Sequence, residues 1–131
     1  MAVDRPVIVI IENDAVQRDL ITMALRKINC HAIPVSSGLN AVKTIEETRP
    51  DLVLLDLFLP QINGLEILHR LQESGKLSLT TVIVISSMSY MEVVEQAKEA
   101  GAHDFLIKPF ESDLLLERVK NALKRREKSP D

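Results

Sequence analysis

The residues that could do chemistry in this 131-residue chain stand directly after runs of aliphatic residues. Glu12 and Asn13 follow the first run, Asp56 follows the third, Ser86 follows the fourth and Lys108 follows the fifth. The set offers carboxylates, an amide, a hydroxyl group and an ammonium group. Because its possible metal ligands are all oxygens, with no Cys or His among them, it favours a hard cation such as Mg²⁺ or Mn²⁺.

The same set of residues is suited to phosphoryl transfer. Mg²⁺ beside an ammonium and a hydroxyl group is a setting for this chemistry, because negative charge must be neutralised on several oxygens. Asp56 is the candidate nucleophile, since a carboxylate can form an aspartyl phosphate. In this interpretation Lys108 supplies the counter-charge and Ser86 donates a hydrogen bond to the phosphoryl group.

Five aliphatic runs predict buried β-strands, and the amphipathic stretches between them predict helices. The predicted strands are 7–11, 31–35, 52–55, 82–85 and 105–107. Alternating strands and helices imply an α/β fold, with helices on both faces of a parallel sheet. Right-handed crossovers bring the carboxyl ends of the strands to one rim. The polar residues that follow the strands are therefore expected to share one cleft there.

Helix starts and buried faces also follow from the sequence. Asp14 is expected to cap the first helix, Ser89 the fourth, as part of a capping box at 89–92, and Ser112 the last. The buried face of the first helix is predicted from apolar residues at helical spacing, which are Val16, Leu20, Met23, Ala24 and Ile28.

Composition narrows the class of protein. The length suits one domain, and 46% hydrophobic residues suit a folded one. Five of the 16 basic residues lie in 120–128, but only one of the 19 acidic residues does. The rest of the chain therefore holds 11 basic and 18 acidic residues. An acidic body argues against direct nucleic-acid binding. The lone Cys30 suits a reducing cytoplasm, and no run is long enough to span a membrane.

Four motifs together resemble the receiver domain of bacterial two-component response regulators. They are residues 11–14, residues 51–60 followed by Asn63-Gly64, residues 82–87 and residues 101–110. The resemblance covers essentially the whole chain. It implies a flavodoxin-like (βα)5 fold with strand order 2-1-3-4-5, one of the common orders of doubly wound sheets. It also implies a single receiver domain over 1–131, with a core of about 6–126 and a tail or linker start at 127–131.

The resemblance implies a role for each residue at the rim. Asp56 would accept a phosphoryl group from a phosphohistidine on a sensor histidine kinase or a histidine phosphotransfer protein. Mg²⁺, or Mn²⁺, would be held by Glu12, Asn13, Asp56 and the backbone carbonyl of Phe58. Lys108 would contact the phosphoryl oxygens. The domain would then be a switch without a metabolic substrate, so it is not predicted to be an enzyme.

The resemblance also implies how the switch responds. Ser86 would swing towards the phosphoryl group, and Phe105 would turn inward and alter the face formed by helix 4, strand 5 and helix 5, a possible homodimer surface. Phe58 and Met88 flank the phosphoryl position in this family, so two bulky apolar side chains are expected to slow its hydrolysis. The bond from Lys108 to Pro109 is typically cis.

The sequence departs from the usual pattern of the family at one residue, and other functions have also to be considered. Asn13 stands where the family usually has Asp, which predicts weaker Mg²⁺ binding. A receiver that docks without phosphorylation is therefore the alternative function. An aspartyl-phosphate hydrolase is less favoured, because its second Asp would stand at Phe58. A flavin carrier is disfavoured by the acids in the first loop. The basic residues of 120–128 suit a solvated helix end or the start of a linker.

Overall fold

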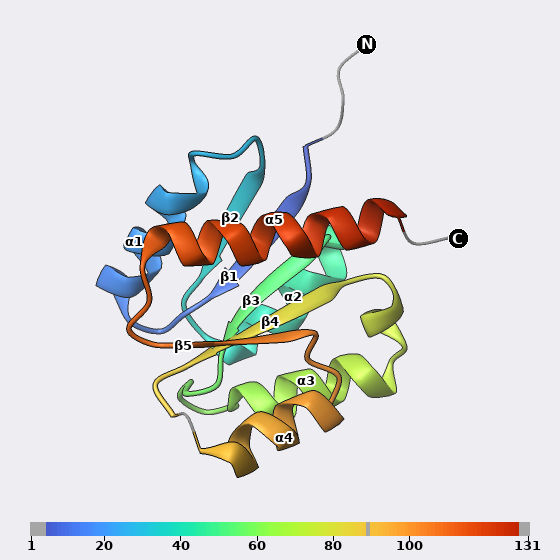
Figure 1. The fold of residues 1–131 in the computed structure, drawn as a ribbon. Helices are drawn as coiled ribbons and strands as arrows, with labels where there is room; N and C mark the ends of the chain where they lie inside the picture. The colour runs from blue at the N-terminus through green and yellow to red at the C-terminus, as the bar shows by residue number, and fades with distance from the viewer. Residues whose placement is uncertain (1–4, 89, 129–131) are drawn as a thin grey trace.

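Five strands and five α-helices alternate along the described part of the chain in the computed structural model (Figure 1). The structure describes residues 5–88 and 90–128, with side chains described up to residue 125. The strands are β1 (Val7–Ile11), β2 (His31–Val35), β3 (Leu52–Asp56), β4 (Thr81–Ser86) and β5 (Asp104–Ile107). The helices are α1 (Ala15–Leu25), α2 (Gly38–Thr48), α3 (Gly64–Glu73), α4 (Met91–Glu99) and α5 (Ser112–Lys128), with a short 3-10 helix, η1, at Lys76–Ser78. None of the helices described is long and apolar enough to cross a membrane.

The strands form one parallel sheet in the order β2-β1-β3-β4-β5. This order confirms the predicted flavodoxin-like fold. Helices α1 and α5 cover one face of the sheet, and α2, α3 and α4 cover the other (Figure 1). The strand order reverses beside β1, so a crevice is expected at the carboxyl ends of β1 and β3.

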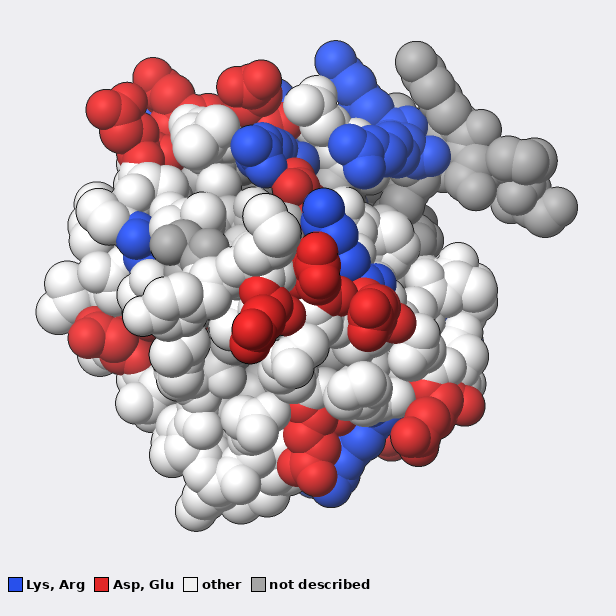
Figure 2. All heavy atoms as spheres, turned by 60° about the horizontal axis from the view of Figure 1, so that its bottom comes forward, with Lys and Arg blue, Asp and Glu red and all other residues white. Residues whose placement is uncertain are grey.

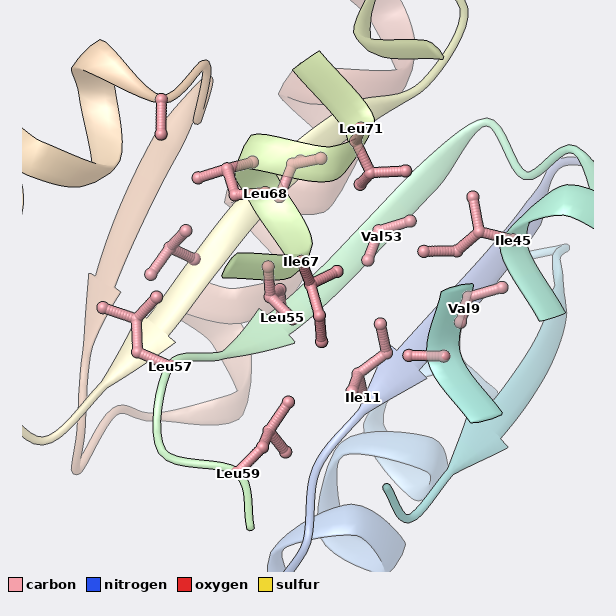
Figure 3. Close-up of a cluster of buried hydrophobic side chains, with 14 of the residues drawn as sticks. Val9, Ile11, Ile45, Val53, Leu55, Leu57, Leu59, Ile67, Leu68 and Leu71 are labelled. Carbon is pink, nitrogen blue, oxygen red and sulfur yellow. The ribbon is translucent and has the colours of Figure 1, made fainter. Parts of the chain in front are cut away.

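Alternate side chains along each strand belong to two apolar cores, one on each face of the sheet. In β1, Val9 and Ile11 belong to the core under α2, α3 and α4, whereas Ile8 and Ile10 belong to the core under α1 and α5. Figure 3 shows the first core, with side chains of β1, β3, α2 and α3 pointing towards one another. Close packing on both faces fixes the relative positions of the strand ends.

The loop after β3 lies close against the sheet because α3 begins with Gly64. A Cβ atom there would lie 2.6 Å from the carbonyl oxygen of Asp56 and 2.6 Å from the Cα of Leu57. Asn63 caps the helix, since its Oδ1 accepts a hydrogen bond from the backbone N–H of Glu66 at 2.9 Å. Glycine therefore lets α3 begin against the end of the strand that carries Asp56.

Strand β2 forms one edge of the sheet and contains Pro34. The backbone N–H of His31 donates to the carbonyl of Pro6 at 2.8 Å, and the carbonyl of Val35 accepts from the N–H of Glu12 at 3.1 Å. Successive residues of a parallel strand turn their backbone groups to opposite sides. Pro34 therefore faces away from β1, and its missing N–H removes no hydrogen bond from the sheet.

The predicted buried face of α1 is wrong at its first three positions. Val16, Leu20 and Met23 are 67%, 54% and 57% exposed. The buried residues of the helix are Ile21, Ala24 and Leu25, which are packed on the core under α1 and α5. Because apolar residues occur on both sides of this helix, spacing alone does not decide which side packs on the sheet.

The predicted helix caps have different outcomes. Asp14 caps α1 as predicted, and its Oδ1 accepts a hydrogen bond from the backbone N–H three residues later at 3.0 Å. Ser89 lies outside the described residues; α4 begins at Met91, and Tyr90 at its N-cap position makes no side-chain cap bond. Ser112 is the first residue of α5, so its prediction as the N-cap is wrong by one position.

Candidate functional site

Three charged side chains from three strands meet at the rim of the sheet. Glu12 follows β1, Asp56 ends β3 and Lys108 follows β5. The Nζ atom of Lys108 donates to Oε1 and Oε2 of Glu12 at 3.0 and 3.1 Å, and to Oδ2 of Asp56 at 2.8 Å. One ammonium group thus bridges two carboxylates, so the structure brings together the residues that the sequence places at one rim.

Burial shifts the protonation equilibrium of Glu12, whose side chain is 2% exposed. Removal from water raises its pKa, because the charged form loses hydration, and the neighbouring Asp56 carboxylate raises it further. Lys108 acts in the opposite direction. The outcome is a rise in the pKa of Glu12 from 4.5 to about 7, so this group exchanges a proton near neutral pH.

The same cluster of charges also raises the pKa of Lys108. Burial alone lowers the pKa of its ammonium group, but the hydrogen bonds and charges of Asp56 and Glu12 outweigh that effect and raise the pKa above its usual value. Lys108 is therefore a cation throughout the physiological range. The peptide bond from Lys108 to Pro109 is cis, as the family resemblance implies.

Asp56 is buried but borders an opening to solvent. Its Oδ1 accepts a hydrogen bond from the backbone N–H of Phe58 at 2.9 Å, and its Oδ2 accepts from Lys108. The opening has a volume of about 340 Å³, and we call it the acidic hollow. Its lining residues are Glu12, Asn13, Asp14, Gln17, Asp56, Phe58, Ser87 and Lys108. A small reactant in this hollow is adjacent to the Asp56 carboxylate.

The oxygens around the acidic hollow fit a hard cation. Glu12 and Asp56 offer carboxylates, Asn13 offers a side-chain amide oxygen and Phe58 offers a backbone carbonyl, and all four residues line the hollow. These are ligands of the type that Mg²⁺ prefers. The described residues contain no group of three or more His, Cys, Asp and Glu side chains placed to hold a metal. The predicted metal set therefore depends on its amide and carbonyl oxygens as well as on two carboxylates.

Ser86 is buried and does not line the acidic hollow. Its Oγ accepts a hydrogen bond from the backbone N–H of Met88 at 3.0 Å, and its carbonyl accepts from the backbone N–H of Lys108 at 2.8 Å. Contact between the Ser86 hydroxyl and a group in the acidic hollow therefore requires this side chain to move.

Of the residues Phe58, Met88 and Phe105, only Phe58 lines the acidic hollow. Phe105 is a half-buried residue of β5 that packs against the core under α2, α3 and α4. Met88 lines a second hollow beside the first, and Phe58, which is 51% exposed, lines both. Phe58 thus lies at the acidic hollow and Met88 at the hollow beside it, whereas Phe105 lines neither of the two.

Sequence reasoning missed several neighbours of the site. Gln17 and Ser87 line the acidic hollow, and so does Asp14, which is predicted only as a cap. Arg18 donates from Nη1 to the carbonyl oxygens of Glu12 and Asn13, at 2.9 and 3.4 Å. The cap at Asp14 is the signal that could have placed the first turn of α1, and hence Gln17, at the rim.

These features define a flavodoxin-like α/β domain in which the Asp56 carboxylate accepts a hydrogen bond from Lys108 at the carboxyl-end rim of the sheet. The family model of the response regulator receiver domain matches residues 8–120. The chain belongs to this family, and the family predicted from its motifs is confirmed.

Relatives and solved structures of the same family are similar to this chain. A DNA-binding response regulator, MtrA of Mycolicibacterium paratuberculosis, is 32% identical over 124 residues, which are 94% of this chain and 53% of MtrA. Chemotaxis protein CheY of Listeria monocytogenes is 40% identical over 88 residues, 67% of this chain and 72% of CheY. The crystal structure of response regulator DrrB, a Thermotoga maritima OmpR/PhoB homologue, has a TM-score of 0.83 at 29% identity, covering 92% of this chain and 54% of DrrB. The chain spans about half the length of MtrA and of DrrB.

Proposed function

We propose that this chain is a phosphoacceptor receiver domain of a two-component system. Asp56 takes a phosphoryl group from a phosphohistidine of a sensor histidine kinase or a histidine phosphotransfer protein. The observation that carries the proposal is the Lys108 Nζ contact with Asp56 at 2.8 Å and with Glu12 at 3.0 Å, at the rim of a receiver-family fold. A carboxylate paired in this way has its counter-charge in place before the phosphoryl group arrives.

The proposed reaction forms one bond and breaks one. A carboxylate oxygen of Asp56 attacks phosphorus, the P–O bond forms as the P–N bond breaks, and the imidazole nitrogen of the donor keeps the electron pair. The Phe58 N–H on Oδ1 orients the carboxylate, and Lys108 offsets negative charge on the transferred group. Glu12, Asn13, Asp56 and the carbonyl of Phe58 are proposed to hold Mg²⁺, which would neutralise phosphoryl oxygens.

Acetyl phosphate with Mg²⁺ tests the proposal without knowledge of the kinase. Wild-type protein is expected to gain one acid-labile phosphoryl group, detected by intact-protein mass spectrometry, and Asp56→Ala is expected to gain none. Asp113→Ala, which removes an exposed carboxylate at the start of α5, is the matched control and is expected to label like wild type. Labelling of Asp56→Ala at the wild-type rate would overturn the assignment of the acceptor.

The second candidate function is a receiver that docks a partner without being phosphorylated. Asn13 favours it, because an amide in place of a carboxylate removes one negative charge from the proposed metal set. Folded wild-type protein that takes no label from acetyl phosphate at high Mg²⁺ would favour this alternative. An aspartyl-phosphate hydrolase has less support, since Phe58 offers no second carboxylate two residues after Asp56.

An exposed apolar strip on α1 supports docking of the phosphohistidine donor. Val16, Leu20 and Met23 are exposed at helical spacing, and the same helix contributes Gln17 to the acidic hollow. Contiguous exposed apolar side chains mark interaction surfaces. We therefore assign this strip to the donor protein, which would reach Asp56 from the side of α1.

The proposed response to phosphorylation runs through Ser86 and Phe105. Movement of the Ser86 hydroxyl towards the phosphoryl group breaks its bond with the Met88 N–H, and Phe105 then packs further inward. The face affected is formed by α4, β5 and α5, where Tyr90, Met91 and Ile107 are exposed. We propose this face as the partner or homodimer surface of the phosphorylated state.

Phe58 and Met88 are proposed to shield the aspartyl phosphate from water. Phe58 lines the acidic hollow and Met88 lines the hollow beside it, and their apolar side chains neither orient nor activate a water molecule. Phe58→Asn and Met88→Glu are each expected to raise the rate of phosphate release several-fold after labelling with acetyl phosphate. Equal release rates in both variants and wild type would refute the shielding.

The domain is proposed to act in the cytoplasm and to make no direct contact with nucleic acid. The acidic balance of residues outside 120–128 supports the second statement, since duplex binding depends on Lys and Arg. MtrA is a DNA-binding response regulator about twice the length of its match to this chain. Any comparable output of this chain is proposed to depend on another domain or on a separate protein.

A further inference from the structure

A hollow of about 490 Å³ lies beside the acidic hollow at the rim. Leu57, Leu59, Leu65, Met88 and Val93 supply its apolar lining, and we call it the apolar hollow. The residues come from the segment after β3, from α3, from Met88 after β4 and from Val93 in α4. The volume and the apolar lining suit a ligand of small-molecule size.

The two hollows share one wall, because Asn13 and Phe58 line both. The acidic hollow is lined by the three carboxyl groups of Glu12, Asp14 and Asp56 and by the one ammonium group of Lys108. An apolar surface and a region of net negative charge are therefore continuous across the side chains of Asn13 and Phe58.

The described residues that line the apolar hollow carry no positive charge. Its lining residues are apolar or amide-bearing, and none of them is Lys or Arg. Figure 2 shows a wide uncharged area at the lower left of the view, while most Lys, Arg, Asp and Glu side chains gather along the top, across the middle and at the lower right. A charged group on a ligand in the apolar hollow would thus find its charged partners in the adjoining acidic hollow.

We propose that the two hollows form one binding site for a small amphiphilic cation. Its alkyl or aryl body lies among Leu57, Leu65 and Val93, and its ammonium group lies at the acidic hollow beyond Asn13. A neutral amphiphile would gain only the apolar contacts, and an anionic one would meet the carboxylates. The net negative charge of the acidic hollow therefore favours a cationic ligand over an anionic one.

Binding of the amphiphilic cation would regulate phosphorylation of Asp56, a consequence that rests on the proposed phosphoacceptor function. Its ammonium group and Mg²⁺ require the same carboxylates, so each weakens binding of the other. A bound amphiphilic cation also covers the approach to Asp56. It is expected to slow labelling by acetyl phosphate, and higher Mg²⁺ concentrations are expected to restore the rate.

The test uses n-hexylamine as the probe, with 1-hexanol and hexanoate as equal-length controls, on the wild-type chain at pH 7.5. Binding is followed by two-dimensional NMR shifts of the backbone and of the Asn13 and Asn63 side-chain amides. Hexylamine is expected to bind at least tenfold more tightly than hexanoate, and about tenfold more tightly than n-butylamine, which buries two fewer methylene groups. Added Mg²⁺ is expected to raise its apparent dissociation constant.

Matched variants locate the site. Leu65→Trp fills the apolar hollow and is expected to weaken hexylamine binding at least tenfold. The control is Leu39→Trp, at an exposed leucine of α2 outside both hollows, and it is expected to leave hexylamine binding unchanged. Leu65→Asn keeps the size and branching of the side chain and adds polarity, and serves if Leu65→Trp does not fold. The proposal would be overturned if hexanoate bound as tightly as hexylamine, or if Mg²⁺ left the dissociation constant of hexylamine unchanged. It would also be overturned if a folded Leu65 variant bound hexylamine with wild-type affinity. Hexylamine binding in protein that acetyl phosphate does not label would overturn the phosphoacceptor function alone.

Discussion

At the scale of single residues, Glu12 couples stability to pH. Its pKa is about 7 in the folded protein against an ordinary value of 4.5, which the unfolded chain restores, so the folded protein holds the proton more strongly. The stabilisation is complete below about pH 4.5 and is lost as the pH rises through 7. In Mg²⁺-free buffer, the Glu12 contribution to the free energy of unfolding is expected to fall by the order of 1–3 kcal/mol over this range.

Urea unfolding at several pH values between 5 and 8 measures this change. Glu12→Gln removes the titrating group, so its stability is expected to vary less over that range. Glu46→Gln alters an acidic residue on the exposed surface of α2 and is expected to keep the wild-type profile. The linkage to Glu12 is wrong if Glu12→Gln and wild type lose the same free energy between pH 5 and 8.

Asn13 is expected to limit the affinity for Mg²⁺. It lines the acidic hollow with an amide where a carboxylate would add one negative charge. Asn13→Asp is therefore expected to tighten Mg²⁺ binding roughly tenfold, equivalent to about 1.4 kcal/mol. Isothermal titration with MgCl₂ above pH 8 measures the change with Glu12 ionised. An unchanged dissociation constant would show that residue 13 does not contribute to the metal set.

At the scale of elements, the absence of a side chain at Gly64 allows α3 to begin directly against the end of β3. A Cβ atom at Gly64 would lie 2.6 Å from backbone atoms of Asp56 and Leu57. Gly64→Ala is therefore expected to cost about 1–3 kcal/mol, because backbone atoms must move. Thermal unfolding measures the loss, and acetyl phosphate labelling is expected to slow because the displaced strand end carries Asp56.

Asn63→Ala separates this displacement from simple weakening of the helix. It removes the cap bond to the Glu66 N–H and adds no atom near Asp56. The expected cost is about 1 kcal/mol, with labelling unchanged. A Gly64→Ala variant that labels as fast as Asn63→Ala would contradict the view that close approach at Gly64 positions the acceptor.

Helix α1 offers a matched pair of neighbouring residues. Ile21 is 3% exposed and belongs to the core under α1 and α5, whereas Leu20 is 54% exposed. Ile21→Ala is expected to cost about 2–4 kcal/mol, because it leaves a cavity. Leu20→Ala is expected to cost less than about 1 kcal/mol. Equal losses in urea unfolding would mean that the helix packs with a different side towards the sheet.

At the scale of the whole molecule, the fold could be predicted because both faces of the sheet are covered. Strands such as 7–11 and 52–55 are apolar on both sides, so each appears in the sequence as a continuous aliphatic run. Their alternation with helices determines the parallel sheet. The rotation of α1 could not be predicted, because Leu20 and Ile21 are both apolar. The 3-10 helix at 76–78 has no periodic signal.

The candidate site could be predicted only in part. Glu12, Asp56 and Lys108 stand at strand ends, so topology alone brings them to one rim, although their roles remain predictions. The bridging position of Lys108 Nζ between two carboxylates depends on side-chain packing, which no spacing in the sequence specifies. The apolar hollow arises between segments distant in sequence, at Leu57 and at Val93. Its shape is a property of the assembled chain.

Pro34 has a consequence for how copies of this chain meet in concentrated solution. An exposed edge strand is a template on which another strand can be added, and such additions propagate into fibrous aggregates. The outer edge of β2 cannot act as a regular template, because the backbone nitrogen of Pro34 points there without a hydrogen. Strand addition at this margin would leave a carbonyl of the incoming chain unsatisfied. One proline thus protects that side of the sheet from aggregation.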